Sequence, residues 1–178
     1  MEQQAFRKKL DRLWERGGKV SLACGRYEIE QSICVNTPCI RIDGESWSYS
    51  SDPNGVFESK YGTKLRLTKD IPAITVGLDH PVEGLLFHNF GVQGNIEGMD
   101  TRDFLKGLTP SGGTGLHFAH TRMDQAEIDA CNFERINVDG CAVGVWFAPR
   151  AAYYNQFRKF VFADNLKHLA RYIYVCRK

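Results

Sequence analysis

The chain has 178 residues, of which 43% are hydrophobic and 25% charged, and this size and composition suit one domain with a hydrophobic core. The formal net charge of +2 is too small to predict a nucleic-acid partner. No run approaches the roughly 18 apolar residues of a membrane span. The first residues lack the apolar stretch of a secretory signal, but a removed signal would leave the same sequence, so the localisation stays open.

The N-terminal residues are expected to form a helix. Residues 2–16 place Phe6, Leu10, Leu13 and Trp14 at helical spacing, with charges on the other face. Two glycines follow at 17 and 18, as is typical of a helix C-terminus. The sequence therefore predicts a helix within residues 1–18.

Short strands are predicted along the rest of the chain. Each predicted strand has three to six residues, is rich in β-branched or aromatic types, and is bounded by Gly, Pro, Asn or Asp. Neither tight hairpins nor helical crossovers connect these runs. Strands of this kind favour a coil whose turns stack in parallel. The predicted strands are 19–24, 27–29, 33–35, 39–42, 64–67, 73–76 and 85–87.

A sequence echo indicates a repeat. Gly115–His120 returns as Ala142–Phe147 and again as Ala170–Val175, at steps of 27 and 28 residues. Strand-like runs at a fixed step are typical of a solenoid, in which each turn buries its apolar side on its neighbours. Two insertions, near residues 46–62 and 98–114, interrupt the period. Because insertions in a solenoid form loops on one face, function is expected where these loops meet the neighbouring strands.

Alternation along the strands assigns their faces. One parity is expected to point inward, and it comprises Leu116, Phe118, Val143, Val145, Phe147, Ile173 and Val175. The other parity gives two outward columns, His117–Gly144–Tyr172 and Ala119–Trp146–Tyr174. In the same alignment Phe133 is expected to stack under Phe160. The six cysteines show no CxxC pair and are interpreted as reduced core residues, and the recurrent asparagines as structural corner residues.

The N-terminal quarter of the chain resembles a known superfamily. Residues 13–29 (LWERGGKVSLACGRYEI) and 39–44 (CIRIDG) resemble the opening of the pectate-lyase-like superfamily, which contains polysaccharide lyases, polygalacturonase-type hydrolases and phage tailspikes. The resemblance implies an all-β fold, a right-handed parallel β-helix with an N-terminal capping helix, as a single domain over residues 1–178. The catalytic set of the polygalacturonases has no counterpart here. The chain stops within a predicted strand, so a longer protein or an oligomer (a trimer, as in tailspikes) is an expectation.

The polar residues of the second insertion and the following strand form a candidate catalytic group. Glycoside hydrolysis needs two carboxyl groups, and elimination from uronates needs a base and often calcium held by carboxylates. The candidates are Asp100, Asp103, Asp124 and His117, with Arg102 and Arg122 as substrate-binding cations. The competing interpretation is an ordinary polar loop. Calcium is the one cofactor considered, and no metal ligands are assigned.

Outward aromatic residues form a candidate binding surface. Trp146, Tyr172 and Tyr174 on a flat parallel sheet would make a platform for sugar rings, and they would equally suit a subunit interface. Two functions therefore remain open. The first is a carbohydrate-active β-helix that binds a polysaccharide and also cleaves it if the acidic group is catalytic. The second is a non-catalytic structural, adhesive or tailspike-like assembly module.

Overall fold

The described part of the chain is built of parallel strands. The computed structural model describes residues 17–47, 62–94, 113–119, 127–148, 151–163, 165 and 167–170. Within these ranges it contains strands and no helix, and all strand pairs are parallel. The expected capping helix falls on residues outside the described ranges. The prediction of an all-β protein with parallel sheets is confirmed.

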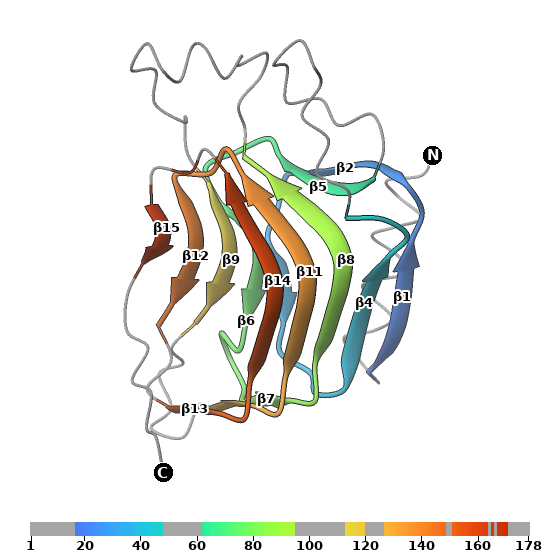
Figure 1. Cartoon of the computed structure of the whole chain (residues 1–178). Coiled ribbons are helices and arrows are strands. Elements are labelled where there is room, and N and C mark those ends of the chain that lie inside the picture. Colours follow the sequence, from blue (N-terminus) through green and yellow to red (C-terminus); the bar gives the residue numbers. More distant parts are fainter. Residues whose placement is uncertain are drawn as a thin grey trace, which may run out of the picture.

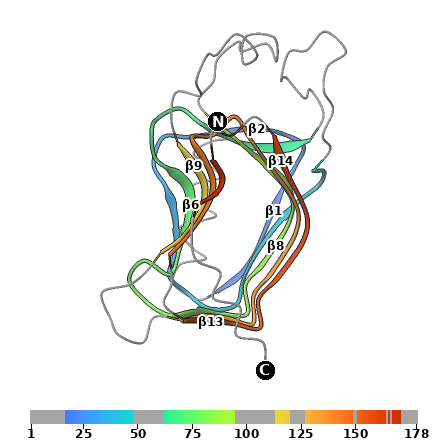
Figure 2. The same cartoon turned by 60° about the vertical axis from the view of Figure 1, so that its left-hand side comes forward.

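Three sheets surround one interior (Figures 1 and 2). The large sheet runs in the order β1 (Gly18–Leu22), β4 (Ile40–Gly44), β8 (Leu86–Gln93), β11 (Asn132–Asp139) and β14 (Gln156–Ala163), and β2 (Gly25–Ile29) joins it through β5 (Thr63–Leu67). The second sheet runs β7 (Val82–Glu83), β10 (Glu127–Asp129) and β13 (Ala151–Tyr153). The third runs β3 (Ile33–Val35), β6 (Pro72–Val76), β9 (Thr114–Phe118), β12 (Val143–Phe147) and β15 (Lys167–Ala170).

The chain visits the three sheets in a fixed order. It passes from the third sheet to the second and then to the large one in β6–β7–β8, and does so again in β9–β10–β11 and β12–β13–β14. Each strand pairs with its counterpart in the next set, as Figure 1 shows for the large sheet from β1 to β14. The repeat inferred from the sequence is therefore present as parallel pairing between successive sets of strands.

Left-handed residues turn the chain between the second and large sheets. Cys39, Gly84, Ala130 and Tyr154 have φ values of 58°, 65°, 49° and 55°. The last three directly follow residues of β7, β10 and β13, which pair with one another. The backbone ladder continues across this corner, because Gly84 N–H donates to Asp129 O and Ala130 N–H donates to Tyr153 O. A second left-handed column, comprising Asn89, Arg135 and Lys159, bends β8, β11 and β14.

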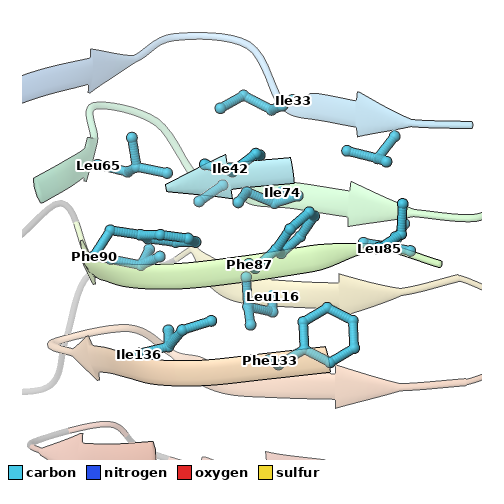
Figure 3. Close-up of a cluster of buried hydrophobic side chains, with 14 of the residues drawn as sticks. Ile33, Ile42, Leu65, Ile74, Leu85, Phe87, Phe90, Leu116, Phe133 and Ile136 are labelled. Carbon is cyan, nitrogen blue, oxygen red and sulfur yellow. The ribbon is translucent and has the colours of Figure 1, made fainter. Parts of the chain in front are cut away.

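Aromatic rings form stacked columns in the core (Figure 3). Phe87, Phe133 and Phe157 occupy one register position on β8, β11 and β14. The rings of Phe87 and Phe133 meet edge to face at 5.3 Å, and those of Phe133 and Phe157 stack at 4.9 Å. The prediction that Phe133 lies under Phe160 is wrong. Phe160 pairs with Ile136, because the left-handed residues at 135 and 159 fix a 24-residue step here.

The strand pairing in the third sheet also differs from the sequence alignment that indicated the repeat. Leu116 pairs with Val145, and Val145 with Leu169, so the steps in the third sheet are 29 and then 24 residues. The first step is two residues longer than in the echo and the second is four residues shorter, and both even differences preserve the parity of the strand. Leu116, Phe118 and Val145 are accordingly buried as predicted, and Phe147 packs against the core. Ala119, assigned to an outward column, is buried.

Asparagine side chains join neighbouring turns. Asn155 accepts a hydrogen bond from Cys131 N–H at 3.0 Å and donates one to Ile128 O at 2.6 Å. Asn165 does the same for Cys141 N–H and Val138 O, both at 2.8 Å. The structural role predicted for these residues is confirmed.

The described cysteines are free thiols, but only two lie in the core. Cys131 and Cys141 are buried, and burial raises the pKa of Cys131 to about 11. Cys24 and Cys39 are exposed, so their assignment to the core is wrong. Cys24 directly precedes β2 and Cys39 directly precedes β4, so both lie in connections between strands. The alternation that buries every second strand residue does not apply in these connections.

Candidate functional site

Most of the site residues predicted from the sequence lie outside the described ranges. These residues are Asp100, Arg102, Asp103, Arg122, Asp124, Tyr172 and Tyr174. Their convergence into one site stays a prediction. His117 and Trp146 lie within the described part of the chain, on adjacent strands of the third sheet.

His117 and Trp146 form a stacked pair on the outer face of the third sheet. His117 on β9 is in register with Trp146 on β12, and the ring centroids lie 4.8 Å apart at an interplanar angle of 27°. The sequence placed these two residues in separate columns, and the two-residue slip in register brings them together. Trp146 is 46% exposed, whereas its neighbours Val145 and Gly144 are buried. The indole is therefore presented outward on a rigid strand.

Burial sets the charge state of the histidine. Desolvation lowers the pKa of His117 below its ordinary value of 6.5, so the imidazole is neutral at neutral pH. A neutral imidazole stacked on an indole forms a flat apolar surface whose ring nitrogens lie at its edges. The column continues to Thr75, which is in register with His117 and whose hydroxyl lies 2.8 Å from that of Ser32. Thr75 is only 4% exposed, so the exposed surface at this column is the aromatic pair.

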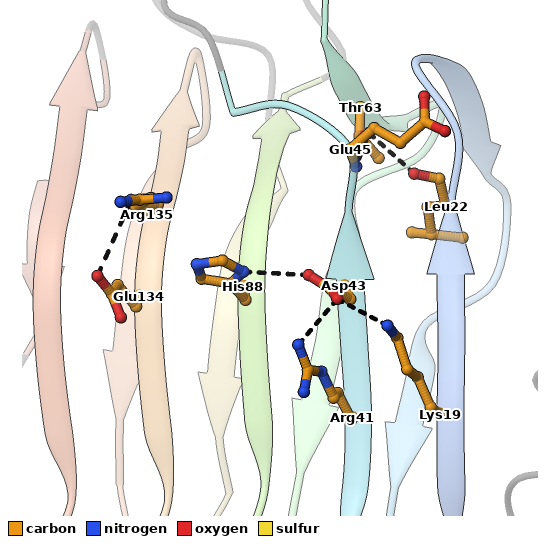
Figure 4. Close-up of polar contacts among 9 residues, drawn as sticks. All are labelled: Lys19, Leu22, Arg41, Asp43, Glu45, Thr63, His88, Glu134 and Arg135. Atoms are coloured by element: carbon orange, nitrogen blue, oxygen red, sulfur yellow. Dashed lines mark hydrogen bonds and ion pairs between the residues drawn. The ribbon is translucent and has the colours of Figure 1, made fainter.

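A second surface, which is polar and was not predicted from the sequence, lies on the outer face of the large sheet (Figure 4). Asp43 on β4 accepts contacts from Lys19 Nζ, Arg41 Nη2 and His88 Nδ1, each at 3.0 Å. Burial raises the pKa of Asp43, but the hydrogen bonds from Lys19, His88 and Arg41 outweigh it and hold the pKa below its ordinary value. Asp43 is therefore an ionised acceptor that orients His88.

The row of outward residues continues across the sheet. His88 on β8 is in register with Glu134 on β11, which pairs in turn with Arg158 on β14. Glu134 Oε1 lies 3.9 Å from Arg135 Nε and from Lys159 Nζ. Adjacent strands are about 4.8 Å apart, so successive side chains of this row are within reach of one another. No local motif marks these residues, because the row exists only once the strands are in register.

A buried ion pair lies further along the same strands. Lys64 Nζ on β5 is 3.8 Å from Asp139 Oδ2 on β11, and Asn137 Nδ2 donates to the same oxygen at 3.2 Å. The side chains of Lys64 and Asp139 are only 9% and 5% exposed. Asn137 is in register with Gly91, which lies beside the Lys64 stem. We assign this cluster a structural role, because its charges compensate each other.

Asp79 and His80 lie in the turn after β6. Asn36 Nδ2 donates to Asp79 Oδ2 at 2.8 Å, and Asp79 N–H donates to Asn36 Oδ1 at 3.1 Å. These reciprocal bonds tie the turn after β6 to the turn after β3. Asp79 is thus engaged with Asn36 and holds two successive turns together.

Within the described ranges, no group of three or more His, Cys, Asp or Glu side chains is arranged to hold a metal ion. The carboxylates considered for calcium are outside those ranges. No helix in the described part of the chain has the length and apolar character needed to cross a membrane.

Comparison with known proteins finds no relative. The chain matches no protein-family model, no curated protein and no solved structure.

Proposed function

We propose that the chain is a right-handed parallel β-helix with an N-terminal capping helix, and that it binds a polysaccharide on the outer face of its third sheet. Parallel pairing between successive sets of strands supports the coil. The resemblance of residues 13–29 and 39–44 to the pectate-lyase-like superfamily supports its handedness and its class of ligand. Fold alone does not imply function, so the proposal depends on the site.

The half-exposed Trp146 stacked on His117 is the observation that carries the proposal. An aromatic ring held flat on a sheet offers a sugar an apolar face to stack on and polar atoms at its edge. The 4.8 Å contact with His117 fixes the plane of the indole, which lowers the entropy lost when a ligand binds. Neutrality of His117 keeps the surface free of a charge that would have to be desolvated.

Titration with polysaccharides tests the proposal. Tryptophan fluorescence and calorimetry would follow binding across a panel of neutral and acidic polysaccharides. We expect Trp146→Ala to weaken binding by about tenfold or more, equivalent to roughly 1.4 kcal/mol. Leu78→Ala is the matched control, because Leu78 is exposed to a similar degree (42%) and lies in the turn after β6, outside the strands that carry His117 and Trp146. Unchanged affinity in Trp146→Ala would exclude this face as the site.

A second candidate function is cleavage of the bound polysaccharide at the large sheet. Asp43 holds Nδ1 of His88, which leaves Nε2 as the proton-accepting atom, the orientation that a carboxylate gives a general base. Asp43 is itself ionised and cannot donate a proton. Hydrolysis through a protonated Asp43 is therefore disfavoured, and His88 would have to transfer the proton.

Product analysis tests cleavage. Reducing ends would reveal hydrolysis or elimination, and ultraviolet absorbance of an unsaturated uronate would reveal elimination alone, with and without calcium. If the large sheet is the site, His88→Gln lowers the rate by about 100-fold or more. His80→Gln, in an exposed turn, should leave the rate unchanged. No products across the panel would leave binding or assembly as the function.

The assembly alternative makes an opposite prediction for the same residue. In a structural or tailspike-like module, Trp146 would be buried between chains. Trp146→Ala would then change the oligomeric state and leave polysaccharide binding unaffected.

A further inference from the structure

The register column that contains His117 and Trp146 crosses the third sheet without a charged side chain. Its five positions run from β3 to β15 and are Cys34, Thr75, His117, Trp146 and Ala170. We call these five positions the neutral column. None of them is an acid, a lysine or an arginine, and burial lowers the pKa of His117, so its imidazole is uncharged at neutral pH. A ligand on this column therefore meets no full charge from the strands that carry it.

The strand positions beside the neutral column also lack charge. Ala73, Gly115 and Gly144 lie two residues before Thr75, His117 and Trp146, and all three are buried. They add neither an acid nor a cation to the surface. The half-exposed indole and the imidazole stacked on it are thus the groups that a ligand would touch first.

The connections on either side of β3 and β6 supply no excess of cations. Within the described ranges they contain three carboxylates and one ammonium group, namely Glu30, Asp70, Asp79 and Lys69. Asp70 Oδ1 accepts a hydrogen bond from Gly113 N–H at 2.7 Å, which holds this carboxylate at the start of β9. The charge of these connections is therefore negative, and it would repel an anionic ligand rather than attract it.

The outer face of the large sheet has a different character. The rows around His88 combine two carboxylates with several basic side chains, which are Asp43, Glu134, Lys19, Arg41, Arg135, Arg158 and Lys159. A ligand that carries carboxylates would find counter-charges on that face. The two faces therefore offer different chemistry to a polysaccharide, and the third sheet offers the uncharged one.

We propose that the outer face of the third sheet binds an uncharged polysaccharide at His117 and Trp146 and discriminates against polymers of uronic acids. This inference rests on the proposed binding function of that face and names its class of ligand. The face of an aromatic ring is electron-rich, so it attracts the C–H groups of a sugar and repels a carboxylate held above it. A carboxylate that loses water here without gaining a cation also raises the free energy of the complex.

Binding of matched polymers tests the proposal. Alginate and polygalacturonate would each be compared with its carboxyl-reduced form, which keeps the backbone linkages and loses the charge, and neutral glucans, galactans and mannans would complete the panel. Calorimetry and tryptophan fluorescence at low salt would give the affinities. Binding that is lost in Trp146→Ala is assigned to this face. We expect such binding with one or more uncharged polymers, and a reduced polymer should bind at least about tenfold more tightly than its uronate parent.

A cation placed in the neutral column should relax the discrimination. His117→Lys puts an ammonium group beside Trp146 and should raise the affinity for uronate polymers about fivefold. Added salt should remove this gain, because it screens the new charge. His117→Gln is the control, because it removes the imidazole without adding a charge and should give no gain. Thermal melting of both variants would show whether they keep the fold.

The outcomes distinguish this inference from the function on which it rests. Uronate polymers that bind through Trp146 as tightly as their reduced forms would overturn the inference and leave the proposed binding function intact. A panel without any binding that depends on Trp146 would overturn both. Equal uronate affinities in folded His117→Lys and His117→Gln would show that the absence of a cation does not set the class of ligand, and this result would also overturn the inference.

Discussion

Single polar side chains hold successive turns together by completing the backbone hydrogen bonding of the corners. Asn155 and Asn165 each bind one N–H group and one carbonyl of the preceding turn. A corner cannot satisfy these groups with a strand ladder, and a buried backbone group without a partner is destabilising. The asparagine amide carries both a donor and an acceptor, so it satisfies two groups at once.

Asn165→Ala should destabilise the protein by about 2–4 kcal/mol, because it leaves two buried backbone groups without partners. Asn155→Ala should have a smaller effect of about 1 kcal/mol, because Asn155 is half-buried and water can replace its side chain. Urea unfolding of both variants would measure the difference. Equal effects would show that burial does not determine the contribution of these corner residues.

Whether a side chain points inward or outward could be predicted from the sequence. Which residue of the adjacent strand lies beside it could not. Alternation correctly placed Leu116, Phe118 and Val145 inside, since parity survives a two-residue slip in register. The same slip separated His117 from Trp146 in the predicted columns, and their stacking emerged only from the structure. Register depends on left-handed residues within the strands, such as Arg135 and Lys159, which no sequence rule marks as glycine-like. Asp43, His88 and Glu134 escaped prediction for the same reason.

The backbones of neighbouring strand sets approach each other closely at some glycines. Gly94 follows β8, and a Cβ there would overlap the carbonyl oxygen of Gly140, the residue that follows β11. Gly91 lies three residues earlier within β8, where a Cβ would meet its nearest neighbour, Lys64 Cγ, at 3.6 Å. These two glycines thus separate the effect of a close approach from the general effect of adding a methyl group.

Gly94→Ala should destabilise the protein by about 3 kcal/mol or more, because backbone atoms of two turns would have to separate. Gly91→Ala should change the stability by less than about 1 kcal/mol, because its new contacts have ordinary lengths. Chemical denaturation of the pair would give both values. A tolerated alanine at 94 would contradict the close approach of the two turns.

The charged contacts of Asp43 link β1, β4 and β8 and should make the stability of the sheet depend on acid. The folded pKa of Asp43 lies below the ordinary 3.8, so its stabilisation is complete above that value and is lost as the pH falls through the folded pKa. Asp43→Asn should remove about 1 kcal/mol at neutral pH and nothing at a pH below the folded pKa. Unfolding measured across this range would test it. A constant difference at all pH values would mean that packing, not charge, is responsible.

At the scale of the whole molecule, stability should vary from turn to turn. Each set of strands contacts only its neighbours, so a central set gains interactions on two sides and a terminal set on one. The aromatic columns show the same gradient, with Phe87 and Phe133 fully buried and Phe157 half-exposed. Local opening of the backbone is expected where buried apolar contacts are fewest.

Hydrogen exchange should therefore be slowest in β8 and β11 and faster in β14. Amide exchange followed strand by strand would measure this gradient. Protection that decreases from β8 and β11 to β14 would fit the repeat architecture. Protection that is uniform along the described strands would instead mean that the sheets unfold as one cooperative unit.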